Sequence, residues 1–99
     1  MKGVHLRTEH DVVEYITSHL RNRPTILEAL EYDNYDYLGS RQTNFGIGKC
    51  IRVESLRCKR PIWITVVVGK PPRETVLVIQ NKEPNLYDSR GAHEYTTDP

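Results

Sequence analysis

The spacing of apolar residues in the first third of the chain predicts a helix. Four of them recur at helical spacing: Val12, Val13, Ile16 and Leu20. Thr8, followed three positions later by Asp11, has the form of a capping box, so we place this helix over residues 9–21. Pro24 marks its end, because proline disfavours helical geometry in the residue before it and cannot donate to the helix ladder.

A second, shorter helix is expected directly after Pro24. Thr25 and Glu28 repeat the capping-box spacing, and an apolar stripe follows the same period until it fades near residues 33–34. The stripe consists of Ile26, Leu27 and Leu30. We expect the two helices to form a hairpin, and we mark residues 2–6 as a candidate edge strand because their polarity alternates.

The pattern becomes extended after the helices. Residues 35–40 predict a strand, and a loop containing Gly46 and Gly48 is expected next. Residues 50–56 then alternate in polarity, which predicts a strand with two different faces. One face holds Ile51, Val53 and Ser55, and the other holds Arg52, Glu54 and Leu56.

Two apolar, β-branched runs give the strongest strand signal. Residues 62–68 are almost wholly apolar, as in an interior strand buried on both faces, and residues 75–80 should pair with them antiparallel across the turn at 69–73. The sequence therefore predicts an α+β fold, with a helical hairpin packed on one face of a three- to five-stranded antiparallel sheet. We expect one domain over residues 1–87, followed by a polar, flexible tail over residues 88–99.

The charge is balanced overall but unevenly placed. The net charge of +1 argues against nonspecific coating of nucleic acid, yet residues 41–73 hold eight cations and one acid, Glu54. Such a segment fits either a solvated sheet face or a surface that faces phosphate. No apolar run approaches the roughly 18 residues of a membrane helix, so we expect a cytoplasmic protein that does not bind membranes. Cys50 and Cys58 are interpreted as packing thiols, with no metal and no cofactor expected.

Candidate chemistry rests on combinations of residues, because no Gly-rich phosphate loop, zinc pattern or nucleophile elbow is present. His10 falls in the first turn of the first predicted helix, and an imidazole is well suited to proton transfer near neutral pH. The alternative for each histidine is an ordinary solvated side chain. Trp63, on a predicted interior strand, is expected to be in the core or in a partner contact rather than in a base-stacking position.

Several segments together resemble a family of small nucleases. Residues 10–16, 26–30, 49–53 and 81–87, with the two apolar strands, are similar to the small ribonuclease domains of the barnase, colicin and RelE-like group, including phage- and toxin-associated members. The resemblance implies a histidine-bearing helix, a short second helix and a basic antiparallel sheet, with metal-independent cleavage of RNA. RelE-type toxins are similar in ending the last strand with a basic segment and a tyrosine.

The residue types needed for that chemistry are present. Metal-independent RNA cleavage requires a base for the 2′-hydroxyl proton, cations for the phosphate and an acid for the leaving oxygen. The candidate catalytic residues are His10, Arg52, Lys82 and Tyr87. The candidate nucleic-acid-binding residues are Lys49, Arg52 and Lys70.

Two other functions fit the same sequence. One is a catalytically inert interaction module, such as an immunity, antitoxin-like or phage accessory protein. It would bind a basic partner through Tyr32, Tyr35 and Tyr37, which lie among acidic residues. The other is a nucleic-acid binder without catalysis, which is favoured if His10 points away from the basic face of the sheet.

Overall fold

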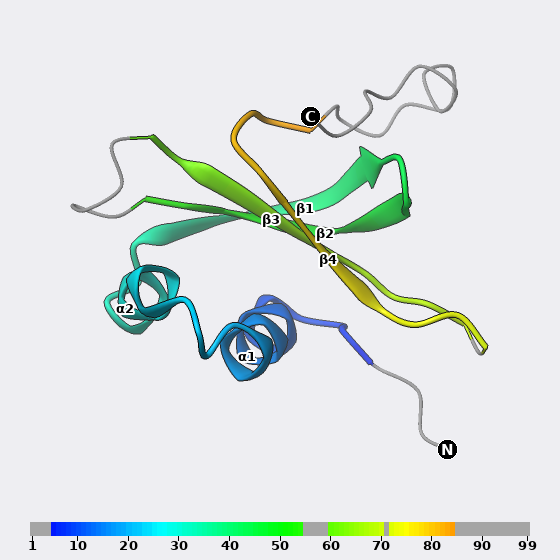
Figure 1. Ribbon diagram of the computed structural model, residues 1–99, viewed down its shortest axis with the longest axis horizontal. Coiled ribbons are helices and arrows are strands. Elements are labelled where there is room, and N and C mark those ends of the chain that lie inside the picture. Colours follow the sequence, from blue (N-terminus) through cyan, green and yellow to red (C-terminus); the bar gives the residue numbers. More distant parts are fainter. Residues whose placement is uncertain (1–4, 55–59, 71, 85–99) are drawn as a thin grey trace.

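The computed structural model describes residues 5–54, 60–70 and 72–84 and has two helices and four strands. The helices are α1 (Glu9–His19) and α2 (Pro24–Glu31), and the strands are β1 (Tyr35–Thr43), β2 (Gly46–Val53), β3 (Ile62–Val67) and β4 (Val76–Gln80). The strands form one antiparallel sheet in the order β1-β2-β3-β4. Both helices lie on the same face of that sheet (Figure 1), which confirms the predicted α+β fold.

The first helix begins as its sequence predicts. The backbone N–H of Asp11 donates to the Thr8 hydroxyl at 3.1 Å, and the Thr8 N–H donates to the Asp11 carboxylate at 3.1 Å. Together these two bonds satisfy backbone donors that a helix leaves free at its start. The helix ends at His19, slightly earlier than predicted.

The second helix begins differently from the prediction. Its N-cap is Arg23, and no side chain caps it, so the capping role predicted for Thr25 is wrong. Pro24 occupies the first turn instead. A proline there already has a helix-compatible φ and lacks one of the N–H groups that a cap would otherwise satisfy.

The prediction of a glycine-containing loop after the first strand is also wrong. Both glycines lie in β2, and the turn is confined to Asn44 and Phe45. Gly46 has φ 124°, which a residue with a side chain rarely adopts, and a Cβ at Gly48 would collide with the carbonyl of Val66. These glycines therefore make a tight turn and allow β2 to approach β3 closely. The candidate strand at residues 2–6 lies partly outside the described residues, and residues 5–7 form no strand.

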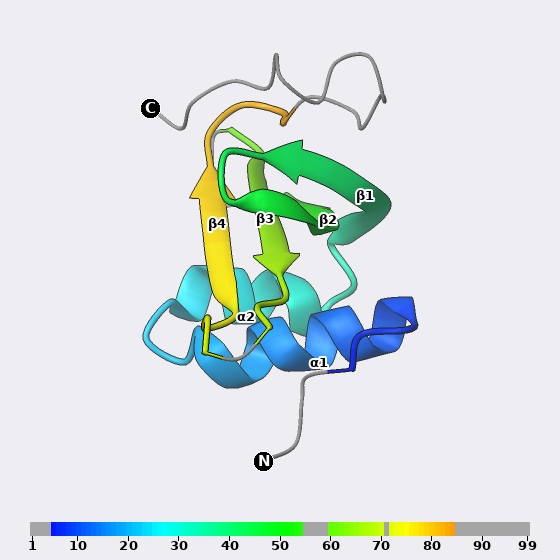
Figure 2. The same cartoon turned by 90° about the vertical axis from the view of Figure 1, so that its right-hand side faces the viewer.

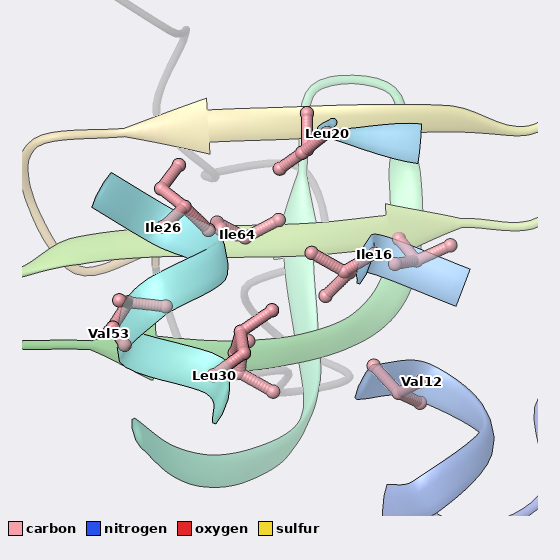
Figure 3. Packing of buried hydrophobic residues seen from close by; sticks show 10 residues of the cluster. Val12, Ile16, Leu20, Ile26, Leu30, Val53 and Ile64 are labelled. Atoms are coloured by element: carbon pink, nitrogen blue, oxygen red, sulfur yellow. The ribbon is translucent and has the colours of Figure 1, made fainter. Parts of the chain in front are cut away.

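The core lies between the helices and one face of the sheet. Figure 3 shows side chains from α1 and α2 directed at the strands, with Ile16 and Ile26 near Ile64 and Leu30 near Val53. All of these except Leu30 are exposed by only 1% or less. Ile51 and Val53 both contribute to this core, which confirms the prediction that they share one face of their strand.

The predicted hairpin of the two apolar strands is confirmed as β3 and β4. They pair antiparallel from Trp63 opposite Gln80 to Val67 opposite Val76, and β3 is an interior strand. After β4, residues 81–84 turn over the face of the sheet opposite the helices (Figures 1 and 2). The predicted tail at residues 88–99 lies outside the described residues. No helix in the part of the chain that the structure describes is long and apolar enough to cross a membrane.

Candidate functional site

Two of the residues predicted to carry out catalysis, His10 and Arg52, lie on opposite sides of the sheet. His10 lies on α1 with its side chain 82% exposed, and its Nε2 is 4.0 Å from the Glu14 carboxylate. Arg52 lies on β2 and points to the opposite face of the sheet, because Ile51 and Val53 on either side of it face the helices. The sheet therefore separates the imidazole from the guanidinium.

Arg52 is already engaged by acidic and aromatic neighbours. Its guanidinium forms an ion pair with Asp36 at 3.1 Å and a second one with Glu54. The same group lies over the Trp63 ring, 5.9 Å from its centroid. A cation held by two carboxylates is a poor phosphate ligand, because their charge repels the phosphate and they already engage both of its terminal nitrogens.

The other predicted cations lie on three different segments of the chain. Lys49 is three residues from Arg52 and therefore faces the helix side, where its Nζ donates to the Ser40 hydroxyl at 3.2 Å. Lys70 is exposed in the connection between β3 and β4, and Lys82 is exposed just after β4. Tyr87 lies outside the described residues.

The three tyrosines predicted to contact a partner, Tyr32, Tyr35 and Tyr37, do not form one continuous exposed surface. Tyr32 is 66% exposed at the end of α2, whereas Tyr35 and Tyr37 are half-buried and pack against the core. Burial raises the pKa of both half-buried phenols above their ordinary value, with a contribution from the nearby Glu9 carboxylate. Only Tyr32 among these three tyrosines is therefore presented to a partner.

The exposed apolar side chains gather instead at one end of the sheet. Phe45 is 59% exposed in the β1–β2 turn, and Ile47 follows it at 47%. Val68 and Val76, on either side of the β3–β4 connection, are 40% and 36% exposed. All four line one open hollow of about 860 Å³. We call these four residues the hairpin-end patch, and Figure 2 views the molecule from this end.

Cations flank the hairpin-end patch on two sides. Lys70 and Arg73 line the same hollow, together with one acid, Glu74. On the helix side, a second hollow of about 290 Å³ brings Lys49 beside Ile47 and Val68. Lys49 and Lys70, two of the predicted binding residues, thus lie at the same end of the molecule, and Arg52 does not.

A third hollow follows the exposed side of α1. Its walls include His5, Glu14 and His19, and its volume is about 260 Å³. The His19 ring stacks on Tyr15 with 4.0 Å between centroids, and its Nδ1 lies 2.9 Å from the Tyr15 carbonyl oxygen. His10 is not part of this wall. In the described ranges 5–54, 60–70 and 72–84, no group of three or more metal-ligating side chains occurs.

The hairpin-end patch was not predicted, because the residues around Gly46 were expected to form a loop. Had that segment been interpreted as strand, the apolar Ile47 would have stood out beside the turn residue Phe45. Comparisons with protein-family models, curated proteins and solved structures found no match. Function must therefore be argued from the surface itself.

Proposed function

We propose that this domain is a catalytically inert protein-interaction module that binds its partner through the hairpin-end patch. The observation that carries the proposal is the clustering of Phe45, Ile47, Val68 and Val76 around one hollow, although single exposed apolar residues are normally scattered. An apolar centre with a charged rim is the usual anatomy of a protein interface. This surface replaces the tyrosine region as the proposed contact.

The charges around the patch indicate the chemistry of the partner. Lys49, Lys70 and Arg73 surround the apolar residues, against the single carboxylate of Glu74. A partner segment with apolar side chains flanked by Asp or Glu would complement both features. Three of the four patch residues are aliphatic, which favours a protein over RNA, because bases stack on aromatic rings.

Synthetic peptides test this proposal directly. A set with apolar residues flanked by Asp and Glu should bind the intact chain more tightly than a matched set with Lys in place of the acids. Phe45→Ser should weaken binding of the acidic peptides by about tenfold or more, which is the effect of removing an interface anchor. Tyr32→Ser is the control, because it removes a similarly exposed aromatic ring outside the patch.

Two results would contradict the proposal. One is equal affinity for the acidic and basic peptide sets. The other is the same loss of binding from Tyr32→Ser as from Phe45→Ser, both measured by fluorescence anisotropy on variants that keep the wild-type circular dichroism spectrum.

RNA cleavage stays a prediction from the resemblance and is the competing outcome. Purified protein, with and without ribosomes, should be incubated with RNA in the presence of a chelator. Cleavage that falls about 100-fold or more in His10→Ala would support a general acid or base at His10 and overturn the inert module. Salt-sensitive RNA binding without cleavage, lost in Lys49→Ala combined with Lys70→Ala, would favour a nucleic-acid binder instead.

A further inference from the structure

The large apolar side chains that are exposed occupy two places on the molecule. Among residues 5–54, 60–70 and 72–84 there are five of them: four form the hairpin-end patch, and the fifth, Tyr32, is the most exposed at 66%. Tyr32 ends α2 and leads into β1, so it lies at the end of the sheet where Tyr35 pairs with Val53. The patch lies at the other end, where Thr43 pairs with Gly46 (Figure 1).

Tyr32 lies in an acidic segment. Glu31 and Asp33, on either side of it, are both exposed, and residues 24–40 contain no Lys, Arg or His. Within the described part of the chain, neither of these two carboxylates forms an ion pair. We call Glu31, Tyr32 and Asp33 the Tyr32 surface. It presents an exposed aromatic ring between two carboxylates that are free to meet cations of another molecule.

The cations described at the same end of the sheet belong to other strands. Arg52 on β2 is already held by two carboxylates. Arg60 precedes β3 and Lys82 follows β4, whereas Tyr32 leads into β1 at the opposite edge of the sheet. The Tyr32 surface therefore keeps its negative charge.

The hairpin-end patch has the complementary features. Lys49, Lys70 and Arg73 flank it, against the single carboxylate of Glu74. Its open hollow of about 860 Å³ exceeds the size of one tyrosine side chain. The chemistry proposed for the partner of this patch, an apolar side chain flanked by acids, is therefore present on the chain itself at Tyr32.

Charge decides how two copies can meet. Two patches facing each other would bring cations together, and two Tyr32 surfaces facing each other would bring carboxylates together, so both twofold arrangements are repulsive. One chain cannot make the contact within itself, because its two surfaces lie at opposite ends of the sheet. The favourable arrangement places the Tyr32 surface of one copy on the hairpin-end patch of the next.

We infer that a second copy of this chain is a partner of the hairpin-end patch and inserts Tyr32 into its hollow in a head-to-tail contact. The inference rests on the proposed function, because it uses the same patch. Each copy in such a contact keeps one surface of each kind free, so further copies can add until a ring closes. The contact centres on one aromatic ring, so we expect weak association that requires a high protein concentration.

Two single variants test the two surfaces separately. Phe45→Ser alters the patch and Tyr32→Ser removes the ring that the patch receives, so each variant alone should raise the dissociation constant of self-association by about tenfold or more. Both positions are exposed, so both variants should keep the wild-type melting temperature within a few degrees.

An equimolar mixture of the two variants gives the sharpest result. The Phe45→Ser chain still has its Tyr32 surface, and the Tyr32→Ser chain still has its patch, so each mixed pair can form one contact and no more. The mixture should therefore form dimers and nothing larger, whereas each variant alone stays largely monomeric.

The contribution of charge is tested with Glu31→Gln combined with Asp33→Asn, which keeps Tyr32. Asparagine tolerates the positive φ of 59° at residue 33. This double variant should weaken self-association by about threefold or more and reduce its dependence on salt. Glu14→Gln is the control, because it neutralises an exposed carboxylate on α1 outside both surfaces. It should leave self-association unchanged.

Sedimentation equilibrium over a concentration series up to about 1 mM measures every sample. A wild-type chain that stays monomeric would overturn the inference, and so would single variants that associate normally, or a mixture that stays monomeric or grows beyond dimers. The peptide assay, run on dilute chain, distinguishes this failure from that of the proposed function. Acidic peptides that bind a chain unable to self-associate would overturn the head-to-tail contact and leave the proposed function standing.

Discussion

The two faces of the sheet come from alternate residues of the same strands, yet their chemistry differs. Toward the helices, Ile51, Val53, Ile64 and Val66 are fully buried and wholly aliphatic. On the other face, Arg52 lies beside Trp63 in one row of cross-strand neighbours, and the next row pairs the Cys50 thiol with the Thr65 hydroxyl. Cys50 and Thr65 are also fully buried. Both faces therefore contain fully buried residues, but those facing the helices carry no polar side-chain atoms, whereas Cys50 and Thr65 do.

Two polar atoms on the second face have no hydrogen-bond partner among residues 5–54, 60–70 and 72–84. They are Trp63 Nε1 and Thr65 Oγ1, and both are shielded from solvent. The Cys50 thiol lies beside this hydroxyl on the neighbouring strand, and a thiol is only a weak hydrogen-bond partner. A buried polar group left unpaired costs about 1–3 kcal/mol. We infer that the helix-facing side supplies most of the stability of the domain.

The largest effect should come from opening a cavity on the helix-facing side. Ile64→Ala removes a fully buried side chain from the centre of the core, so the free energy of unfolding should fall by about 2–5 kcal/mol. Val76→Ala, at an exposed position on the neighbouring strand, is the control and should change it far less. Urea unfolding measures both, and equal losses would show that the helix-facing core is not dominant.

A smaller and opposite effect is expected from Thr65. Thr65→Val replaces the poorly paired hydroxyl with a methyl group of similar size, so stability should stay the same or rise by up to about 1 kcal/mol. The control, Ile64→Val at the adjacent residue, should lower stability by about 0.5–1.5 kcal/mol because it removes one buried methylene. The difference between the faces would be refuted if Thr65→Val were the more damaging change in thermal unfolding.

The smallest expected effect is a pH dependence of stability that arises from Asp11 at the start of α1. Hydrogen bonds from the backbone N–H groups of Arg7 and Thr8 lower the pKa of Asp11 below its ordinary value of 3.8. The ionised carboxylate therefore contributes stability above about that pH, and this contribution is lost as the pH falls through the folded-state pKa. The difference in melting temperature between the wild type and Asp11→Asn should shrink as the pH is lowered from neutral toward the folded-state pKa. A difference in melting temperature that stays constant with pH would contradict the lowered pKa of Asp11.

Features set by local pattern could be predicted from the sequence. The Thr8 cap, the two helices and the β3–β4 hairpin each depend on residues close together in the chain, and all are present. Alternation along β2 also predicted correctly that Ile51 and Val53 share one face. The same alternation separates Lys49 from Arg52, so their assignment to one binding face was already inconsistent with the expected strand geometry.

Features that depend on close approach between strands could not be predicted in the same way. Gly48 resembles a loop residue in the sequence, but it lies in β2 because the neighbouring strand leaves no room for a side chain. The hairpin-end patch follows from that placement, since it brings residues from both hairpins around one hollow. The separation of His10 from Arg52 likewise depends on which face of the sheet the helices cover.

The strand order of the sheet also has a consequence for how the chain folds. Each strand pairs with its neighbour in the sequence, so no strand must wait for a distant segment before it can pair. Closing short loops loses little chain entropy, and folding rates rise as contacts become more local. The sheet can therefore grow one hairpin at a time, and β4, which follows all the other strands in the chain, can join a sheet edge that already exists.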